Sequence, residues 1–199
     1  MQHSKAAITL FDEYSAITED EGRRRDADEE LSLRYFSVDL ALRSAQQVLE
    51  PSRRVRNWVT SLLQLERFTF DEGRRPRENN RLDRGQITGG ERRLTEWTRY
   101  QRRTATQTQH CAYQIRRLET VPGFRWNPLS DQWRQNFDEY FRFVTRYGAP
   151  AYRSKNAEQH KLASWASRQR RAHALGVLPL DRFELLDQAD YWAWTVATR

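Results

Sequence analysis

The chain repeats itself over much of its length, and this duplication constrains the fold more than any other feature of the sequence. Five positions recur at one constant separation, which pairs Trp58, Leu62, Leu65, Phe68 and Gly73 with Trp133, Phe137, Tyr140, Phe143 and Gly148. Further along, a second and shorter separation pairs Leu94, Trp97, Gln101, Arg102 and Arg103 with Leu162, Trp165, Gln169, Arg170 and Arg171. A tandem module of about 70 residues is therefore present twice, with a longer loop in the first copy.

The sequence pattern of each copy predicts three helices. The last part of the repeat keeps the shorter separation and pairs Ile115, Leu118, Phe124 and Trp126 with Phe183, Leu186, Trp192 and Trp194. Apolar residues follow helical spacing before each glycine, which is suited to end a helix. Strand signals are weak throughout. We therefore expect an all-α fold of two tandem three-helix modules, residues 52–127 and 128–199, preceded by an N-terminal helical pair in residues 1–51.

That N-terminal segment is acidic and helical. Residues 1–50 contain 6 Lys or Arg against 11 Asp or Glu. Apolar spacing predicts one helix over about residues 5–19 and a second over about residues 26–50, which Pro51 closes. The second has a heptad-like seam of Leu31, Tyr35, Val38, Leu42, Ala45 and Leu49. Residues 26–50 could therefore form a homodimer or dock a protein partner. The alternative is that the seam packs on the body of its own chain.

The rest of the chain is strongly basic. Residues 51–199 hold 28 Lys or Arg against 16 Asp or Glu, and 31 of the 34 basic residues in the whole chain are arginine. A basic body indicates an anionic partner. Arginine forms planar, bidentate contacts with phosphates and guanine edges, so the bias suits nucleic-acid recognition. A GC-rich genome would also enrich arginine codons.

Composition argues against several other classes of protein. Cys111 is the only cysteine, and the four histidines do not have metal-ligand spacing, so we expect no metal and no other cofactor. No nucleophile–base pair or carboxylate dyad stands out, so we do not expect an enzyme. No apolar run approaches the length of a membrane-spanning helix and no signal peptide is evident, which predicts a soluble, cytoplasmic protein without a membrane partner.

The order of the repeated residues resembles the helicase-associated domain. Its features are a Trp, spaced apolar residues, a Gly, a loop, Leu-x-x-Trp-x-x-x-Gln-Arg and a closing aromatic-x-Trp, over about residues 55–194. That repeat occurs in bacterial proteins, often attached to superfamily 2 helicases, and is taken to bind nucleic acid. The chain has no G-x-x-x-x-G-K-[ST] phosphate-binding loop. The resemblance therefore implies a stand-alone binding module without ATP-driven activity.

Helical periodicity separates core residues from contact residues in the repeat. At about 100° per residue, Gln169 lies in the middle of the apolar face, and so does Gln101. We expect both to make a buried hydrogen bond to a backbone group. Arg171 lies opposite the core and Arg168 and Arg170 flank it, so these arginines are expected to be solvated and able to reach phosphate. The alternative is an ordinary charged helix face.

These considerations predict a set of nucleic-acid contacts on the second helices and the unequal loops. They are Arg74, Arg75, Arg77, Arg81, Arg84, Tyr100, Arg102, Arg103, Arg153, Lys155, Arg168, Arg170 and Arg171. The partner is expected to be a nucleic acid, with duplex DNA favoured and RNA left open, bound by phosphate anchoring and by a helix or loop that enters a groove. The protein would then be a regulator or an accessory factor of a phage or mobile element. The competing function is a protein-interaction module, such as an adaptor or inhibitor, that docks through the N-terminal helices or aromatic faces.

Overall fold

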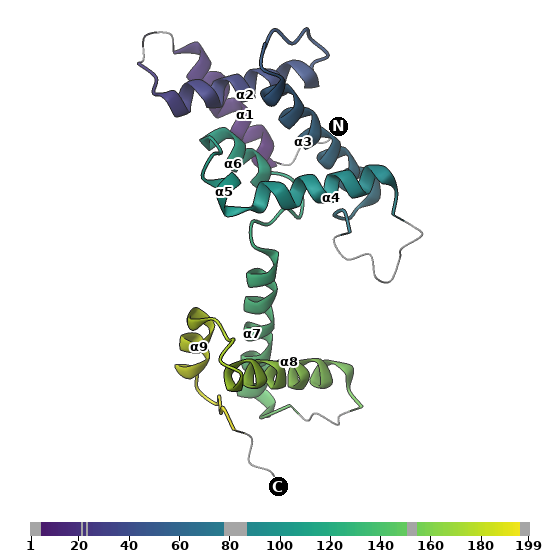
Figure 1. Ribbon diagram of the computed structural model, residues 1–199, viewed down its shortest axis with the longest axis vertical. Coiled ribbons are helices and arrows are strands. Elements are labelled where there is room, and N and C mark those ends of the chain that lie inside the picture. The colour runs from purple at the N-terminus through teal and green to yellow at the C-terminus, as the bar shows by residue number, and fades with distance from the viewer. Residues whose placement is uncertain (1–4, 21, 23, 78–86, 151–154, 196–199) are drawn as a thin grey trace. The chain divides into compact units, whose positions relative to one another are not determined.

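The computed structural model describes residues 5–20, 22, 24–77, 87–150 and 155–195, with the backbone alone at residues 104 and 105. The fold is all-α, as predicted, and no strand occurs in these ranges (Figure 1). None of the helices described is long and apolar enough to cross a membrane. The helices are α1 (Lys5–Glu19), α2 (Ala27–Arg43), α3 (Arg53–Glu72), α4 (Gly89–Arg102), α5 (Thr104–Gln107), α6 (Ala112–Glu119), α7 (Pro128–Tyr147), α8 (Ala157–Ala174) and α9 (Leu180–Asp187).

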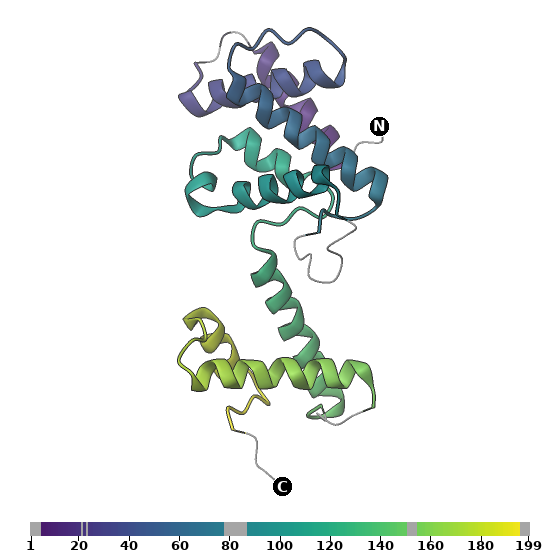
Figure 2. The same cartoon turned by 45° about the vertical axis from the view of Figure 1, so that its right-hand side comes forward.

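The chain forms two compact units, Met1–Trp126 and Asn127–Arg199. The helices of the two units correspond at the separations that the sequence shows. Helices α3 and α7 begin and end at equivalent positions of the repeat, and so do α6 and α9. Helix α8 begins at the position equivalent to the start of α4 and continues through positions that the short α5 occupies in the first unit (Figure 2). Gly73 and Gly148 each follow the first helix as its C-cap, both with positive φ.

Each unit has its own aromatic core. In the first unit, α1 and α2 contribute Leu10, Tyr14, Tyr35, Phe36 and Val38 to the residues buried with Trp58, Leu62, Tyr113 and Leu118. The core of the second unit is smaller and consists of Trp133, Tyr140, Val144, Leu162, Trp165, Ala166 and Leu186. The N-terminal segment is therefore part of the first unit and is not a separate segment beside it.

Helix α2 is shorter than the heptad-like seam predicts. Asp26 begins it by accepting a hydrogen bond from the backbone of Glu29 at 2.8 Å. It ends at Arg43, not near residue 50, and two residues later Ala45 has a φ of 53°, outside the helical region. The following segment returns along α2, because Glu50 forms an ion pair with Arg34 at 2.6 Å. The extension of this helix over residues 44–50 was therefore a wrong prediction.

The seam of α2 packs within its own chain. Tyr35 and Val38 are each 2% exposed and belong to the core that α3 and α6 complete. The rings of Tyr35 and Trp58 lie 5.3 Å apart in an edge-to-face arrangement. Leu42 and Leu49 are exposed. The middle of the seam is thus covered by α3 and α6 of the same chain. Of the two alternatives, intramolecular packing describes this helix.

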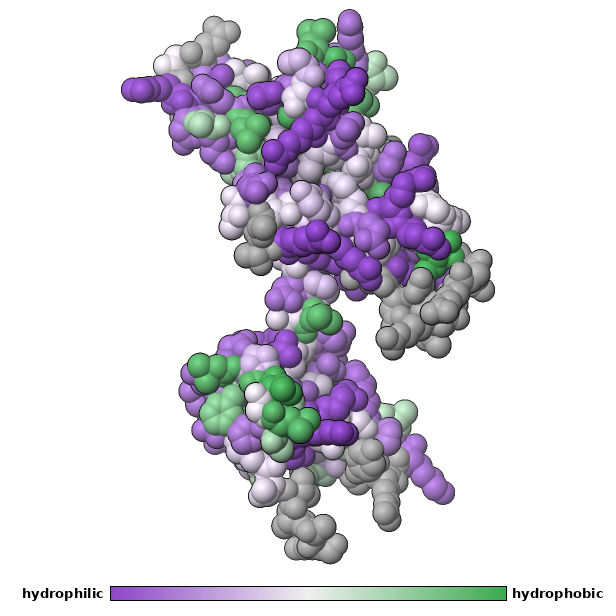
Figure 3. All heavy atoms as spheres, viewed as in Figure 1, coloured by the Kyte–Doolittle hydropathy of each residue, from purple (hydrophilic) through white to green (hydrophobic). Residues whose placement is uncertain are grey.

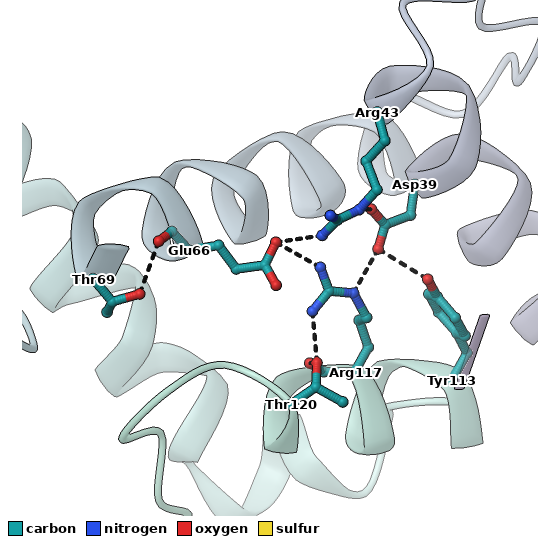
Figure 4. A network of polar contacts seen from close by, with 7 residues as sticks. All are labelled: Asp39, Arg43, Glu66, Thr69, Tyr113, Arg117 and Thr120. Atoms are coloured by element: carbon teal, nitrogen blue, oxygen red, sulfur yellow. Dashed lines mark hydrogen bonds and ion pairs between the residues drawn. The ribbon is translucent and has the colours of Figure 1, made fainter. Parts of the chain in front are cut away.

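A buried charge cluster joins α2 to α3 and α6 (Figure 4). Its members are Asp39, Arg43, Glu66, Tyr113 and Arg117. The side chains of Asp39 and Arg117 are fully buried, and Arg117 Nε lies 2.7 Å from Asp39 Oδ2. Arg117 Nη2 lies 2.7 Å from a Glu66 carboxylate oxygen, while Arg43 pairs with both carboxylates. Two positive and two negative side chains therefore balance one another inside the unit.

The cluster also sets the protonation of its members. Burial raises the pKa of Tyr113, and the Asp39 carboxylate, to which the Tyr113 hydroxyl donates at 2.9 Å, raises it further. Burial opposes the charge on Arg117, but the Asp39 and Glu66 carboxylates outweigh that effect and raise its pKa. Tyr113 is therefore neutral and Arg117 charged, which is the pattern that an electrically balanced cluster needs.

Candidate nucleic-acid interface

The tryptophan and glutamine of the repeat form the same buried pair in both units. Trp58 Nε1 donates to Gln101 Oε1 at 2.9 Å, and Trp133 Nε1 donates to Gln169 Oε1 at 2.8 Å. Each of these indole rings also lies 5.9 Å from the tryptophan of the second helix. Both glutamines were expected to be buried with a hydrogen bond to a backbone group, and both are buried. Gln169 makes that bond, donating from Nε2 to the carbonyl oxygen of Trp165 at 3.4 Å, whereas the backbone partner expected for Gln101 was a wrong prediction. The glutamine oxygen serves an indole N–H from another helix, because a buried tryptophan needs a partner for that group.

We expect Gln169→Leu to destabilise the second unit by about 1–3 kcal/mol, because it leaves the indole N–H of Trp133 buried without an acceptor. Thermal unfolding followed by circular dichroism measures the change. The exposed Gln132→Leu on α7 is the matched control and should change stability little. If Gln169→Leu unfolds at the same temperature as Gln132→Leu, the hydrogen bond between Trp133 and Gln169 does not stabilise the unit.

Arg102 and Arg170 are also used internally. Each donates from Nε to the carbonyl oxygen of a residue in the closing segment of its module, Arg125 or Ala193, at 2.7 Å in both units. The guanidinium of Arg102 lies 5.3 Å from the ring centroid of Phe124, and that of Arg170 lies 4.5 Å from Trp192. Both arginines are half-buried. The expectation that both arginines are fully solvated is therefore wrong, since each fastens the closing aromatic segment of its module to the second helix. Their contact with phosphate stays a prediction.

The closing tryptophans make a third recurring contact. Trp126 Nε1 donates to Glu119 at 2.9 Å, and Trp194 Nε1 donates to Asp187 at 3.0 Å. Glutamate and aspartate thus hold equivalent positions at the ends of α6 and α9. Three recurring polar contacts define one module architecture that the chain uses twice.

The loop arginines that were predicted to contact nucleic acid have different surroundings in the structure. Arg74 pairs with the buried Glu91 through its two terminal guanidinium nitrogens, at 2.6 and 3.2 Å. One of these nitrogens also lies 3.1 Å from a carboxylate oxygen of Glu72. Arg77 donates its backbone N–H to the same Glu91, at 2.9 Å. Arg75 is exposed. Its side-chain methylenes lie beside Gly123, and a Cβ atom added to this glycine would lie 3.0 Å from them. Arg74 is thus held inside the protein's own structure. Arg81, Arg84 and Arg153 lie outside the described residues.

We expect Glu91→Gln to cost about 1–2 kcal/mol at neutral pH. The Arg74 hydrogen bonds lower the pKa of Glu91, although burial acts in the opposite direction. A carboxyl whose folded pKa lies below its unfolded value stabilises the protein above that value, and the contribution is lost as the pH falls through the folded pKa. The difference between wild type and Glu91→Gln, measured by urea unfolding, should therefore be largest at about pH 7 and shrink below about pH 4. The control is Glu96→Gln, on the exposed face of α4. If wild type and Glu91→Gln differ in stability as much in acid as at neutral pH, this expectation is contradicted.

The exposed face of α4 carries a basic stripe. It consists of Arg92, Arg93, Glu96, Arg99 and Tyr100 of α4 together with Arg103, the C-cap residue of this helix, all exposed. At 100° per residue these positions fall within about 120° of the helix, opposite the buried Leu94 and Gln101. Tyr100 is 51% exposed, and the Arg103 guanidinium lies 5.6 Å from its ring centroid. We call this set the α4 stripe. Four arginines and one glutamate give it a formal charge of +3.

The same positions of α8 form a second basic stripe. Its members are His160, Lys161, Ser164, Ser167, Arg168 and Arg171. Five of the six side chains are exposed and Ser164 is half-buried. Lys161 also reaches Glu139 of α7, at 2.8 Å. The formal charge of this α8 stripe, with the histidine neutral, is again +3. Equal charge is thus kept on the two helices, although only one of the six positions has the same residue in both.

The stripes contain Tyr100, Arg103, Arg168 and Arg171 from the predicted contacts. They also contain basic residues that were not predicted: Arg92, Arg93, Arg99, His160 and Lys161. The missing signal was available, because the periodicity that places Arg171 opposite the core extends to the first turns of both helices. Lys155 is exposed but precedes α8 and is not part of its stripe.

The exposed side chains of the two units differ beyond the stripes. Hydrophilic residues cover α4 in Figure 3, whereas hydrophobic residues gather over α9 and the adjoining end of α8. The exposed hydrophobic residues of this part of the second unit are Leu175, Val177 and Leu180, each 65–69% exposed. The equivalent positions in the first unit are Gln107, Gln109 and Ala112. Similar scaffolds therefore present dissimilar loops.

No family model, curated protein or solved structure matches this chain. The resemblance to the helicase-associated domain stays a prediction. Within the described ranges there is no group of three or more His, Cys, Asp or Glu side chains that could hold a metal ion. The assignment of function therefore depends on the surface chemistry of the two units.

Proposed function

We propose that this protein binds duplex DNA through the α4 and α8 stripes, as a tandem of modules related to the helicase-associated domain. The supporting observation is the recurrence of a +3 stripe on the equivalent helix of both units, with different residues carrying the charge. Packing imposes apolar residues on the buried side of a helix, but it imposes no charge on the exposed side. A charge retained in both copies therefore favours a common anionic ligand.

The dimensions of the stripes fit this ligand. From the first to the last member, each stripe spans eleven helical steps, or about 16 Å of helix. A helix of this kind fits the major groove of B-DNA, which is about 12 Å wide, or lies along one of its phosphate backbones. The arginines would contact phosphates and position the module, while Tyr100 lies on the same face.

Charge reversal on single stripes tests the proposal. Arg92→Glu/Arg93→Glu changes the α4 stripe and Arg168→Glu/Arg171→Glu changes the α8 stripe. We expect each pair to weaken binding to a labelled duplex by at least about tenfold at 0.1 M salt, because every phosphate contact contributes to affinity at this ionic strength. Fluorescence anisotropy measures the dissociation constants.

The matched control is Arg142→Glu/Arg146→Glu, an equal change of charge on exposed positions of α7. It should weaken binding much less than the stripe variants. Equal losses for control and stripes would indicate a general effect of net charge and contradict the assignment. Arg102 and Arg170 are unsuitable for this experiment, because their internal hydrogen bonds make folding and binding inseparable.

A second candidate function is protein docking by the second unit. The exposed Leu175, Val177 and Leu180 favour it, because clustered exposed aliphatic residues mark interaction surfaces. In this case Val177→Gln, which introduces the residue of the first unit, would abolish partner capture and leave DNA binding unchanged. Absence of DNA binding at low salt would leave docking as the better-supported function.

A further inference from the structure

A pocket of about 490 Å³ opens in the first unit, beside the α4 stripe. It lies among the start of α3, the end of α4, α5 and the start of α6. The residues important to its chemistry are Arg54, Asn57, Trp97, Tyr100, Gln109 and His110. No carboxylate belongs to the residues that line it. Its volume falls in the range of small-molecule and cofactor sites.

The floor of the pocket is held by the fold. Trp58 and Gln101 form the buried pair described above, and His110 Nε2 lies 2.8 Å from the same Gln101 oxygen. His110 Nδ1 lies 2.6 Å from the carbonyl oxygen of Thr106. Burial lowers the pKa of His110, and its hydrogen bonds with the backbone of Thr106 and Gln107 raise it by less.

The rim offers the groups that a nucleobase requires. Tyr100 is 51% exposed and presents a ring on which a base can stack. The exposed amides of Asn57 and Gln109 each supply a donor and an acceptor, which matches the edge of an unpaired base. Arg54 adds a positive charge at the same opening. An aromatic face, edge-reading amides and a cation are therefore combined in one pocket.

The second unit shows that the scaffold does not require these residues. Its equivalents of Arg54, Gln109 and His110 are Leu129, Val177 and Leu178. At the position of Gln114, the second unit has Arg182, whose guanidinium lies 5.2 Å from the ring centroid of Trp133 and covers the indole that corresponds to Trp58. The charge of Arg54 and the amide of Gln109 are thus replaced by aliphatic side chains in the second unit, whereas Asn57 corresponds to another amide, Gln132. Structural need does not account for Arg54 or Gln109, since the same fold is built with leucine and valine at their positions.

We infer that this pocket receives one unpaired base of a nucleic acid whose backbone lies along the α4 stripe. The inference rests on the proposed function and adds a preference for strands with a base outside the stack. Bases that are unstacked are commonly recognised by aromatic stacking and by hydrogen bonds to their edges. The first unit would then recognise an unpaired base in the strand, while the second, which has aliphatic residues in place of Arg54 and Gln109, would contribute affinity.

The test compares a perfect duplex with the same duplex carrying a single-nucleotide bulge. Wild-type protein should bind the bulged duplex about tenfold more tightly, the scale that stacking of one base provides. Arg54→Leu/Gln109→Val introduces the residues of the second unit, and it should lower the preference several-fold, because it removes the charge and one of the two amides at the rim. Its affinity for the perfect duplex should match that of Arg53→Leu, a neighbouring arginine that does not line the pocket. Tyr100→Leu removes the stacking ring and should reduce the preference to about one.

The outcomes separate the two proposals. If neither duplex is bound, the proposed function fails and the pocket loses its ligand. If wild type binds both duplexes equally, or if the preference survives both pocket variants, the pocket inference alone is overturned. Thermal unfolding verifies that the variants fold. If the double variant does not fold, Tyr100→Leu still decides the test, because half of the Tyr100 surface is exposed and its replacement should not disturb the core.

Discussion

Arg117→Leu is expected to destabilise the first unit by about 3–5 kcal/mol, although leucine is the residue that the second unit has at this position, Leu185. The substitution leaves Asp39 and Glu66 with one arginine between them, and the Asp39 carboxylate is fully buried. Removing one partner of a buried ion pair leaves a charge without compensation, which costs more than the pair itself contributes. Leucine is tolerated in α9 because the second unit has no counterpart of α2, which carries Asp39, and has Phe141 at the position of Glu66.

Urea unfolding of the whole chain measures this effect, with Arg116→Leu as the control. Arg116 precedes Arg117 on α6 and pairs with Glu13, but its side chain is 47% exposed. The control should change stability by less than about 1 kcal/mol. Asp39→Leu/Arg117→Leu should recover part of the loss, since both members of the pair are then absent. A single variant as stable as Arg116→Leu would contradict the structural role of the cluster.

Reversal of both stripes together is expected to have the largest effect on binding. The combined variant Arg92→Glu/Arg93→Glu/Arg168→Glu/Arg171→Glu should bind duplex DNA at least about a hundredfold more weakly than wild type at 0.1 M salt. Two modules on one chain reinforce each other when both contact one ligand, so loss of both removes this gain as well. Anisotropy titrations measure the change, and circular dichroism verifies that helix content is preserved. A loss no greater than that of one stripe alone would show that the other stripe does not contact DNA.

The duplication and the helices could be read from the sequence because they depend on local patterns. The first helix was predicted at the ends it has, Lys5–Glu19, and the repeated glycines end α3 and α7 as expected. Helix α2 was predicted too long. Its apolar spacing continues past Arg43, but the chain turns back there and brings Glu50 against Arg34, a contact between residues that local periodicity does not connect.

The contact residues were predicted less well, for a physical reason. An angle on a helix indicates which side of that helix a residue occupies, but it does not indicate what another segment places there. Arg170 flanks the core, and the segment that ends in Trp194 returns to that flank and accepts its hydrogen bond. Arg171 lies one position further along and is exposed. Similarly, periodicity placed Gln169 inside the protein but could not identify the indole of Trp133 as its partner.

The dependence of duplex affinity on salt tests the account most directly, because counterion release scales with the number of phosphates neutralised. For wild type, the logarithm of the association constant should fall steeply with the logarithm of salt concentration, by about 0.9 for each phosphate contact. Arg92→Glu/Arg93→Glu and Arg168→Glu/Arg171→Glu should each reduce this slope by about 2, while Arg142→Glu/Arg146→Glu leaves it near the wild-type value. A wild-type affinity that does not change with salt, or slopes that are equal in the stripe variants and the control, would contradict it.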